Sequence, residues 1–370
     1  MITRIKGMSD LFKEVINQGL CTKCGACVGA CPYTVFYAGK IRMLDYCDRS
    51  EGNCYRYCPR TITDLDAISE AIFSTSYSVD ELGTVKDIVI ARAKDARIRE
   101  RSQYGGAISS LISFAFDQSL IDRAILTRTD NENLPAGYIA SKSSEVINAA
   151  GSNYIAYPAL EALNRIPNES RDRLAIVVTP CQAIALAKMK AEPTEQRVGV
   201  ANVRLTIGLF CTWALDYDAF YPFLKKHLDT RRVKKFDITP PPANRLDVYF
   251  EREVVSFPLE DIRNYVMPAC TYCTDMTAEF ADISVGAVEG LDGWNTLVVR
   301  SMIGADIVRA AEKAGKLDIK DVPLKNLQHL KEAAMLKKKR AVKAIVSKTG
   351  DKNNLLYLNM SDALRDKLLG

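Results

Sequence analysis

The sequence lacks several features that mark whole classes of protein. No uninterrupted apolar run approaches the ~20 residues that a membrane-spanning helix needs. The opening residues MITRIKGMSDLFKEV have no apolar stretch before their charges, so we expect no secretory signal and a cytoplasmic location. Histidine occurs only twice, and a net charge of +5 over 370 residues is too small to indicate a nucleic-acid partner. With 48% hydrophobic and 26% charged residues, the composition is that of a globular protein.

Cysteine, in contrast, is abundant and unevenly distributed. Of the 11 cysteines, seven lie between Cys21 and Cys58, and four are spread over the rest of the chain. In a chain without a secretory signal these residues are not expected to form disulfides, so they indicate metal or redox chemistry. The first ~75 residues are also rich in glycine and proline and show little periodicity, which is typical of a segment where a metal replaces an apolar core.

The rest of the chain alternates between short apolar segments and helical patterns. Residues 85–93, 121–128 and 173–180 are examples of predicted strands. The alternation predicts an α/β domain whose mixed or parallel sheet is covered by helices on both faces. Residues 233–260, which include a triple proline, predict an inserted antiparallel β-hairpin, and 324–348 predict one long basic helix.

The run C-x2-C-x2-C-x3-C-P from Cys21 to Pro32 is the most specific motif. In ferredoxins this spacing wraps three thiolates around a 4Fe–4S cluster, and the fourth cysteine reaches across to a second cluster. Gly25 allows the loop to turn tightly around such a bulky group. C-x2-C also serves zinc, but zinc knuckles rarely carry a four-cysteine run that ends in Cys-Pro. The motif therefore favours iron–sulfur binding by Cys21, Cys24, Cys27 and Cys31.

The second half of the ferredoxin pattern is incomplete. It keeps the ending Cys58-Pro59 but has three cysteines where four are expected, the other two being Cys47 and Cys54. If the first three cysteines of the run join Cys58 in one cluster, a second cluster lacks a fourth thiolate. Asp48 or Glu51 could supply an oxygen ligand, the site could hold a 3Fe–4S cluster, or a single N-terminal cluster could leave spare thiols. We favour two clusters, and we divide the chain into a ferredoxin-like 4Fe–4S domain at 1–80 and a second α/β domain at 81–370.

Four cysteines remain outside the N-terminal segment. Cys181 and Cys211 each follow a predicted buried strand, and ligands of open α/β sheets collect at the carboxyl ends of strands. The C-x2-C pair Cys270 and Cys273 could complete a site with four thiolates. A free cysteine is often only a buried core residue, so neither of the first two carries the inference alone. The four together favour a further cluster.

The sequence resembles the beta subunits of coenzyme F420 hydrogenases and formate dehydrogenases. The resemblance covers most of the chain and is carried by GLCTKCGACVGACP, CYRYCPR, SQYGGAISSLISFAFDQSLID, VVTPCQAIAL, IGLFC and PACTYCTDMTAEFADISVGAVEGLDGWNTLVVRSMIG. It implies a subunit of an oxidoreductase complex that binds FAD with a 4Fe–4S cluster close by, about three clusters in all. It further implies that the flavin exchanges a hydride with the deazaflavin coenzyme F420. The clusters would connect the flavin to a partner subunit that is catalytic or donates electrons. This partner would resemble a subunit of a hydrogenase, a formate dehydrogenase or a heterodisulfide reductase.

Two kinds of residue are candidates for contacts with the flavin. Gly-rich turns that open helices offer N–H groups to a pyrophosphate, as Gly105–Gly106 and the turn at Gly151–Ser152 could, although each could be a simple turn. Ser152 and Thr179 could hydrogen-bond the flavin ring or ribityl chain. The family stretch ADIS-x-G followed by T-x-x-x-R implies further contacts from Asp282, Gly286, Asn295, Thr296 and Arg300.

The last helix carries a basic stripe. It consists of Lys331, Lys337, Lys338, Lys339 and Arg340. Such a run is usually a solvated helix face, but it could also contact FAD phosphates or an anionic coenzyme, and we take Lys338 as the candidate. No side chain is assigned a catalytic role, because a flavin supplies the hydride chemistry and the protein orients it.

Two other functions stay open. The chain could be an electron-transfer adaptor without a flavin. It could also be a ferredoxin-linked reductase of another organic substrate, as are relatives of this fold that reduce a chlorophyll derivative. The identity of the hydride acceptor rests on analogy alone.

Overall fold

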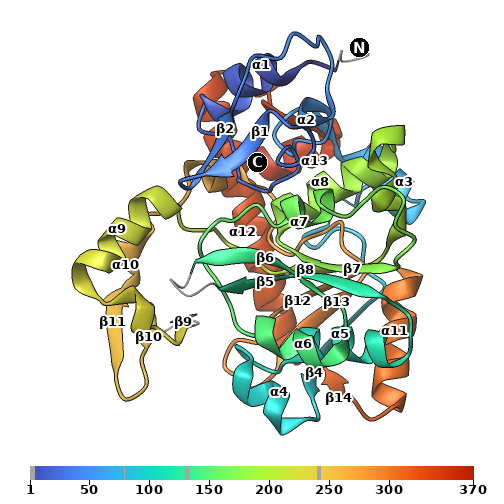
Figure 1. Cartoon of the computed structure of the whole chain (residues 1–370), viewed down its shortest axis with the longest axis vertical. Helices are drawn as coiled ribbons and strands as arrows, with labels where there is room; N and C mark the ends of the chain where they lie inside the picture. Colours follow the sequence, from blue (N-terminus) through green and yellow to red (C-terminus); the bar gives the residue numbers. More distant parts are fainter. Residues whose placement is uncertain (1–4, 79, 130–133, 240–242) are drawn as a thin grey trace.

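The computed structural model describes residues 5–78, 80–129, 134–239 and 243–370. An eight-stranded mixed sheet lies between two layers of helices, with the N-terminal segment at one end and a three-stranded sheet projecting from one side (Figure 1). In these ranges no helix has both the length and the apolar character that a membrane span requires.

The large sheet has the strand order β14-β4-β13-β12-β8-β7-β5-β6. Its central strands β5, β7, β8 and β12 are parallel, and every other pairing is antiparallel. Parallel strands covered on both faces need apolar residues at almost every position, as the LAIVV of β7 provides. The predicted α/β class with a mixed sheet is confirmed. The strands are β4 (Asp87–Ala93), β5 (Arg123–Thr129), β6 (Pro135–Ala140), β7 (Leu174–Val178), β8 (Val203–Leu209), β12 (Ile283–Ala287), β13 (Asn295–Val299) and β14 (Leu317–Asp321).

Helices cover both faces of this sheet. One face packs against α5 (Ala107–Asp117), α6 (Ser143–Val146) and α11 (Met302–Lys313), with α4 (Ala96–Arg101) in the same layer. The other face packs against α3 (Leu65–Phe73), α7 (Leu160–Asn164), α8 (Pro180–Ala191), α12 (Leu324–Thr349) and α13 (Asp362–Leu369). Short helical turns occur at η2 (Ile147–Ala149), η3 (Glu195–Asn202), η4 (Thr230–Arg232) and η5 (Pro268–Tyr272).

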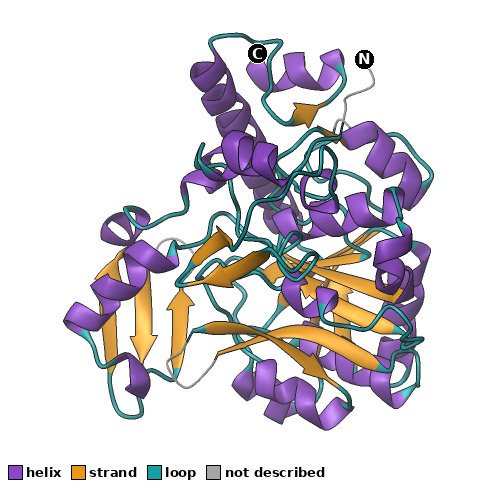
Figure 2. Ribbon diagram, turned by 45° about the horizontal axis from the view of Figure 1, so that its top comes forward, coloured by secondary structure: helices purple, strands orange, loops and turns teal. Residues whose placement is uncertain are grey.

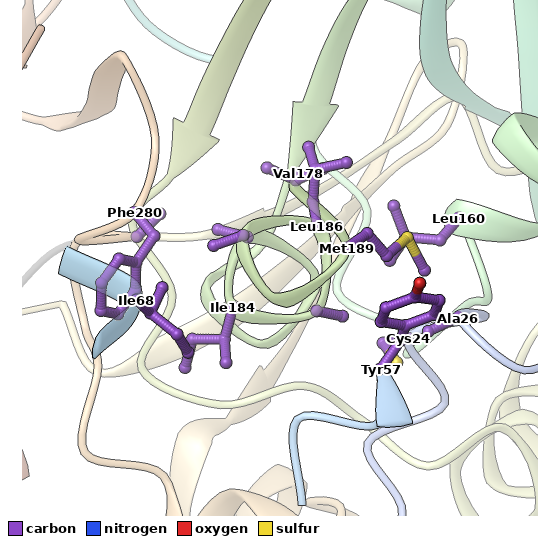
Figure 3. Packing of buried hydrophobic residues seen from close by; sticks show 14 of the residues in the cluster. Cys24, Ala26, Tyr57, Ile68, Leu160, Val178, Ile184, Leu186, Met189 and Phe280 are labelled. Carbon is purple, nitrogen blue, oxygen red and sulfur yellow. The ribbon is translucent and has the colours of Figure 1, made fainter. Parts of the chain in front are cut away.

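The N-terminal segment shares its core with the α/β part. Figure 3 shows Tyr57 and Cys24 beside Leu160 and Met189, in the same cluster as residues of β7 and α8. The hydroxyl of Tyr57, which is fully buried, donates to the carbonyl of Glu192 at 2.8 Å. The division near residue 80 therefore stays a prediction, since the packing is continuous across it.

The N-terminal segment itself is built from short elements. They are α1 (Met8–Leu11), the π-helical turn η1 (Phe12–Ile16), β1 (Thr34–Tyr37), β2 (Lys40–Met43), α2 (Asn53–Arg56) and β3 (Thr63–Asp64). β3 pairs in parallel with β15 (Leu358–Asn359), so the end of the chain returns to this segment. Its own apolar core is small, and cysteines pack around it.

The inserted hairpin at 233–260 is part of a three-stranded antiparallel sheet. The order is β11-β10-β9, and the sheet stands apart from the large one (Figure 2). The triple proline at 240–242 lies outside the described residues. The insert consists of α9 (Tyr217–His227), β9 (Lys235–Ile238), β10 (Arg245–Tyr249), β11 (Val254–Pro258) and α10 (Leu259–Arg263).

Candidate cofactor sites

The cysteines gather in three groups, and the first lies in the loop after η1. We call Cys21, Cys24, Cys27 and Cys58 the first thiol set. With Cys54 they line one cavity, whose remaining wall is largely apolar. Burial, together with the thiols of Cys58 and Cys181, raises the pKa of Cys21 to about 12. Burial and the neighbouring thiols likewise raise the pKa values of Cys24 and Cys27. The four sulfurs are thus close enough to influence one another electrostatically.

Gly25 lets this loop lie directly against α7. Its φ is +91°, and a Cβ atom there would stand 2.6 Å from the carbonyl oxygen of Pro158. The contact is fixed by two hydrogen bonds, from Leu160 N to the Cys24 carbonyl at 3.2 Å and from Asn164 Nδ2 to the Gly25 carbonyl at 3.2 Å. A Cβ atom at position 25 would meet backbone atoms of Pro158 and Glu161. No side chain could therefore rotate away to make room for it.

We expect Gly25→Ala to displace the loop and to lower the iron content of the protein. Strained φ and a backbone clash each cost on the order of 1–3 kcal/mol, and together they act on the loop that carries three cysteines. The measurement is iron per chain after anoxic purification. Gly315→Ala, also at positive φ but with open space around it, is the matched control and should keep its iron. Equal iron in both variants would contradict the prediction.

The second thiol set consists of Cys31, Cys47 and Cys54. Burial raises the pKa of Cys54 to about 11, and the thiols of Cys31 and Cys47 add to the effect. Asp48 and Glu51 are exposed. Cys54 also lines the cavity of the first set, so the two sets adjoin each other. The division of the seven cysteines into four and three ligands stays a prediction, as does an oxygen ligand from either carboxylate.

The inner thiol set consists of Cys181, Cys211, Cys270 and Cys273. Cys181 stands in the first turn of α8, Cys211 follows β8, and the other two belong to the η5 region. Burial raises the pKa of Cys270 to about 11, with further contributions from Cys273 and Cys181. Burial raises the pKa of Cys211 too, and all three other thiols of the set act on it. Three segments far apart in the sequence thus converge at the carboxyl edge of the sheet, and the binding of a cluster by these four thiols stays a prediction.

Two buried cations accompany the inner set. Lys337 donates from Nζ to the carbonyl of Cys211 at 2.6 Å, and Arg60 donates to the carbonyl of Ala269, next to Cys270, at 3.5 Å. Burial alone would raise the pKa of Cys273, but Lys337 and Arg60 lower it below its usual value, which favours the thiolate. Sequence reasoning missed Arg60, although it follows Cys58-Pro59 directly. Lys337 could have been found, because it shares a 3–4 spacing with the buried residues Ala334 and Ala341 of α12.

In the part of the chain that the structure describes, no three His, Cys, Asp or Glu side chains are arranged to hold a single metal ion.

Most of the residues suggested for the flavin lie at the carboxyl edge of the sheet. Thr179 follows β7, and Asn295 begins β13 beside the Gly105–Gly106 turn. Asn295 Oδ1 accepts from Ala107 N at 3.2 Å, and a Cβ atom on Gly105 would stand 2.8 Å from that same oxygen. Gly106 has a φ of +72°. The turn is therefore held in one shape by Asn295.

Gly286 and Thr296 face each other across β12 and β13 at this edge. Any Cβ on Gly286 would overlap the ring of Phe210, and the hydroxyl of Thr296 bonds the carbonyl of Ala287 at 3.4 Å. Gly286 thus allows Phe210, directly before Cys211, to pack flat on the sheet.

Asp282 and Arg300 are not brought to this edge. Asp282 precedes β12 and Arg300 follows β13, both at the far edge of the sheet, and the five residue steps from Asn295 to Arg300 span roughly 16 Å of strand. The fully buried guanidinium of Arg300 donates to the carbonyls of Leu82 and Thr84 at 2.5 and 2.8 Å. Asp282 accepts from Thr206 N at 2.8 Å and from the Ser301 hydroxyl at 2.6 Å. Their contacts to a flavin stay a prediction.

Lys338 is also buried within the protein. Its ammonium pairs with Glu279 at 2.5 Å and donates to the Tyr77 hydroxyl at 2.7 Å, and the Lys338 and Glu279 side chains are 2% and 1% exposed. The Tyr77 hydroxyl donates to the same carboxylate. The expectation of a solvated basic stripe is thus wrong for Lys337 and Lys338, because a buried acceptor faces each of them. A contact between Lys338 and FAD stays a prediction.

A second polar group lies between the carboxyl edge and the insert. Gln103 bonds Asp237 and lies 3.4 Å from the hydroxyl of Tyr154, which accepts from Ile238 N at 3.0 Å. Two buried atoms here have no partner among the described residues, Gln103 Oε1 and Asn153 Nδ2. Ser152 stands next to Asn153, and Gly151 has open space where a Cβ would be. No motif marks Gln103 or Tyr154, so sequence reasoning did not find them.

Comparisons with known proteins show the family to which the chain belongs. The family of the coenzyme F420 hydrogenase/dehydrogenase beta subunit is described by two models, and the C-terminal one matches residues 171–325 while the N-terminal one matches 88–164. Residues 14–37 match a 4Fe-4S binding domain. The beta subunit of coenzyme F420 hydrogenase from Methanothermobacter thermautotrophicus is 30% identical over 72% of this chain and 96% of its own length.

Two further similarities extend the comparison. A chain in a structure of the F420-reducing nickel–iron hydrogenase complex from Methanosarcina barkeri superposes with a TM-score of 0.68 at 28% identity, covering 74% of this chain and 96% of that one. The F subunit of the F(420)H(2) dehydrogenase of Methanosarcina mazei is 31% identical over 90% of this chain and 93% of its own length. With a 4Fe–4S binding domain at its start, the chain belongs to the family of the beta subunits of coenzyme F420 hydrogenases and dehydrogenases.

Proposed function

We propose that this chain is an iron–sulfur flavoprotein subunit that passes electrons between a partner subunit, its clusters and FAD, and a hydride between FAD and coenzyme F420. The observation that carries the proposal is the convergence of the inner thiol set at the carboxyl edge of the sheet, next to the first thiol set. When bound, the clusters would supply one-electron transfer and the flavin two-electron hydride transfer.

The donor chemistry of the thiol sets fits iron–sulfur clusters. Soft thiolates are the ligands such clusters require, and the first and inner sets each offer four of them. Buried thiolates carry uncompensated negative charge, and at the inner set Lys337 and Arg60 offset part of it. The second set offers three thiolates, so a cluster there would need a further ligand or would be of the 3Fe–4S type.

The carboxyl edge fits a flavin. The unpartnered polar atoms of Gln103 and Asn153 are buried and offer one acceptor and one donor. Asn295 fixes the Gly105–Gly106 turn at the start of α5, where a pyrophosphate would be bound by backbone N–H groups. Ser152 and Thr179 lie at the same edge and would orient the ring or the ribityl chain. Their role is to hold the flavin close to the inner thiol set and to exclude water from it.

The test is a cofactor count on protein purified without oxygen. We expect about 11 or 12 iron atoms and one FAD per chain, because three clusters of four or three irons fill the three sets. The flavin absorbance should bleach when reduced coenzyme F420 is added. About eight irons would mean a single N-terminal cluster.

The same experiment separates the alternatives. An iron–sulfur spectrum without extractable flavin would contradict the proposal and favour the adaptor. A flavin that reduced coenzyme F420 does not bleach would favour a reductase of another substrate. Subunits that co-purify with the chain would identify the electron partner, and cell fractionation would test the cytoplasmic location.

A further inference from the structure

Arg60 is buried between the first and the inner thiol sets. It lies two residues after Cys58, and its side chain is among the least exposed charged groups, with 3% of the residue accessible. Its guanidinium donates to the carbonyl of Ala269 at 3.5 Å, directly before Cys270 of the inner set, and the next residue, Thr61, donates from N to the carbonyl of Cys58 at 3.3 Å. A single buried cation therefore stands between the segments that carry the two thiol sets.

The C-terminal segment holds Arg60 in this position. The guanidinium carbon lies 4.5 Å from the centroid of the Tyr357 ring, an arrangement in which the aromatic face attracts the cation. The Tyr357 hydroxyl donates to the carbonyl of Tyr272 at 2.6 Å, between the two cysteines of the C-x2-C pair. Thr63 N donates to the Tyr357 carbonyl at 2.7 Å. The cation is thus anchored to the loop that carries Cys270 and Cys273.

The remaining contacts leave the charge of Arg60 available to the thiols. Its terminal nitrogens are 3.4 Å from the Pro59 carbonyl and 3.5 Å from the Ala269 carbonyl, and Nε has no partner among the described residues. Buried donors are normally satisfied, so a free N–H beside two thiol sets indicates a further acceptor in the loaded protein.

We propose that Arg60 is a positioning residue whose fixed positive charge is shared by the first and the inner cluster sites and stabilises the reduced state of both. The inference rests on the proposed function, because it needs a cluster at each set. Reduction adds one negative charge to a buried site, and a nearby cation in a low dielectric lowers the energy of that state. Hydrogen bonds and net charge are known to set cluster potentials in this way.

Two lysines differ from Arg60, because each of them contacts only one thiol set. Lys188 donates to the carbonyl of Cys58 at 2.8 Å, and its pKa responds to Cys58 and Cys24. Lys337 donates to the carbonyl of Cys211, and its pKa responds to the inner thiols. Substitution of Lys337 should therefore shift the potential of the inner cluster alone.

The experiment is a redox titration of the full-length, anoxically purified protein, followed by electron paramagnetic resonance of the reduced clusters. In Arg60→Gln we expect the signals of both the first and the inner clusters to move to more negative potential. The reduction equilibrium of each should weaken at least tenfold, which is about 59 mV for a one-electron couple. Arg60→Lys keeps the charge, so both signals should stay close to their wild-type potentials. Lys337→Gln should move only one signal.

Arg309→Gln removes the same charge from the exposed face of α11 and should move none. Full iron content with unchanged potentials in Arg60→Gln, or a shift confined to one signal, would overturn the proposal. Should Arg60→Gln lose its iron, Arg60→Lys decides instead, since a shift of about 59 mV or more in either signal despite the retained charge would overturn the proposal. A wild-type protein without cluster signals would instead contradict the proposed function.

Discussion

Replacing Cys273 by serine should remove about four irons from the protein and interrupt electron passage between the flavin and the N-terminal clusters. Cys273 is the one thiol of the inner set whose pKa is lowered, because Lys337 and Arg60 outweigh the effect of burial. It is therefore the thiolate best prepared for a metal. A serine hydroxyl at the same place is a harder ligand and keeps its proton, so the set is left with three donors.

The measurement begins with the isolated, loaded protein and reduced coenzyme F420. In the variant the flavin should still bleach, whereas the cluster signals of the first and second thiol sets should no longer develop at the wild-type rate. Thr274→Ser, a conservative change at the adjacent buried position, is the matched control and should keep both iron and electron passage. Full iron content in Cys273→Ser, together with normal cluster reduction, would show that Cys273 is no ligand.

The central sheet is visible in the sequence because its strands are buried on both faces. The apolar runs at 85–93, 121–128 and 173–180 correspond to the observed strands β4, β5 and β7. β6 and β14 were not predicted, since each is an edge strand paired on one side only. Their sequences PAGYIA and LDIKD contain the glycine and charged residues that edges tolerate, and such residues weaken the apolar signal. The periodicity of a strand also does not show which other strands it pairs with. The antiparallel pairing of β13, β4 and β14 at one side of the sheet could therefore not be predicted.

The grouping of the cysteines could be predicted where it depends on short stretches of sequence. The spacing from Cys21 to Cys31 places three thiols in one loop, and strand ends locate Cys181 and Cys211 at one edge of the sheet. The burial of a charged side chain, in contrast, depends on residues that are far away in the sequence. Arg300 is buried because carbonyls of residues 82 and 84 face it, more than 200 positions earlier in the chain. The sequence therefore gives no sign that a basic residue is buried when its acceptor lies far away along the chain.

Lys338 is a second buried cation, and its partner makes it important for stability. We expect Lys338→Met to destabilise the protein by about 3–5 kcal/mol, because it leaves Glu279 charged and unpaired in a site almost closed to water. Lys331→Met removes a charge from the exposed face of the same helix and should change the free energy of unfolding by no more than about 0.5 kcal/mol. Urea titration of both variants under anoxic conditions measures the difference.

A double variant separates the loss of an ion pair from the loss of a cofactor contact. Lys338→Met combined with Glu279→Leu removes both charges, and it should recover much of the stability, since a buried ion pair can be replaced by apolar residues at little cost. The Tyr77 hydroxyl then loses both partners, so recovery should be completed by Tyr77→Phe. A contact between Lys338 and an FAD phosphate predicts the opposite pattern, in which Lys338→Met keeps its stability and loses flavin, and the double variant recovers none. Because Glu279 rather than solvent faces the ammonium, we expect stability and not flavin content to respond first.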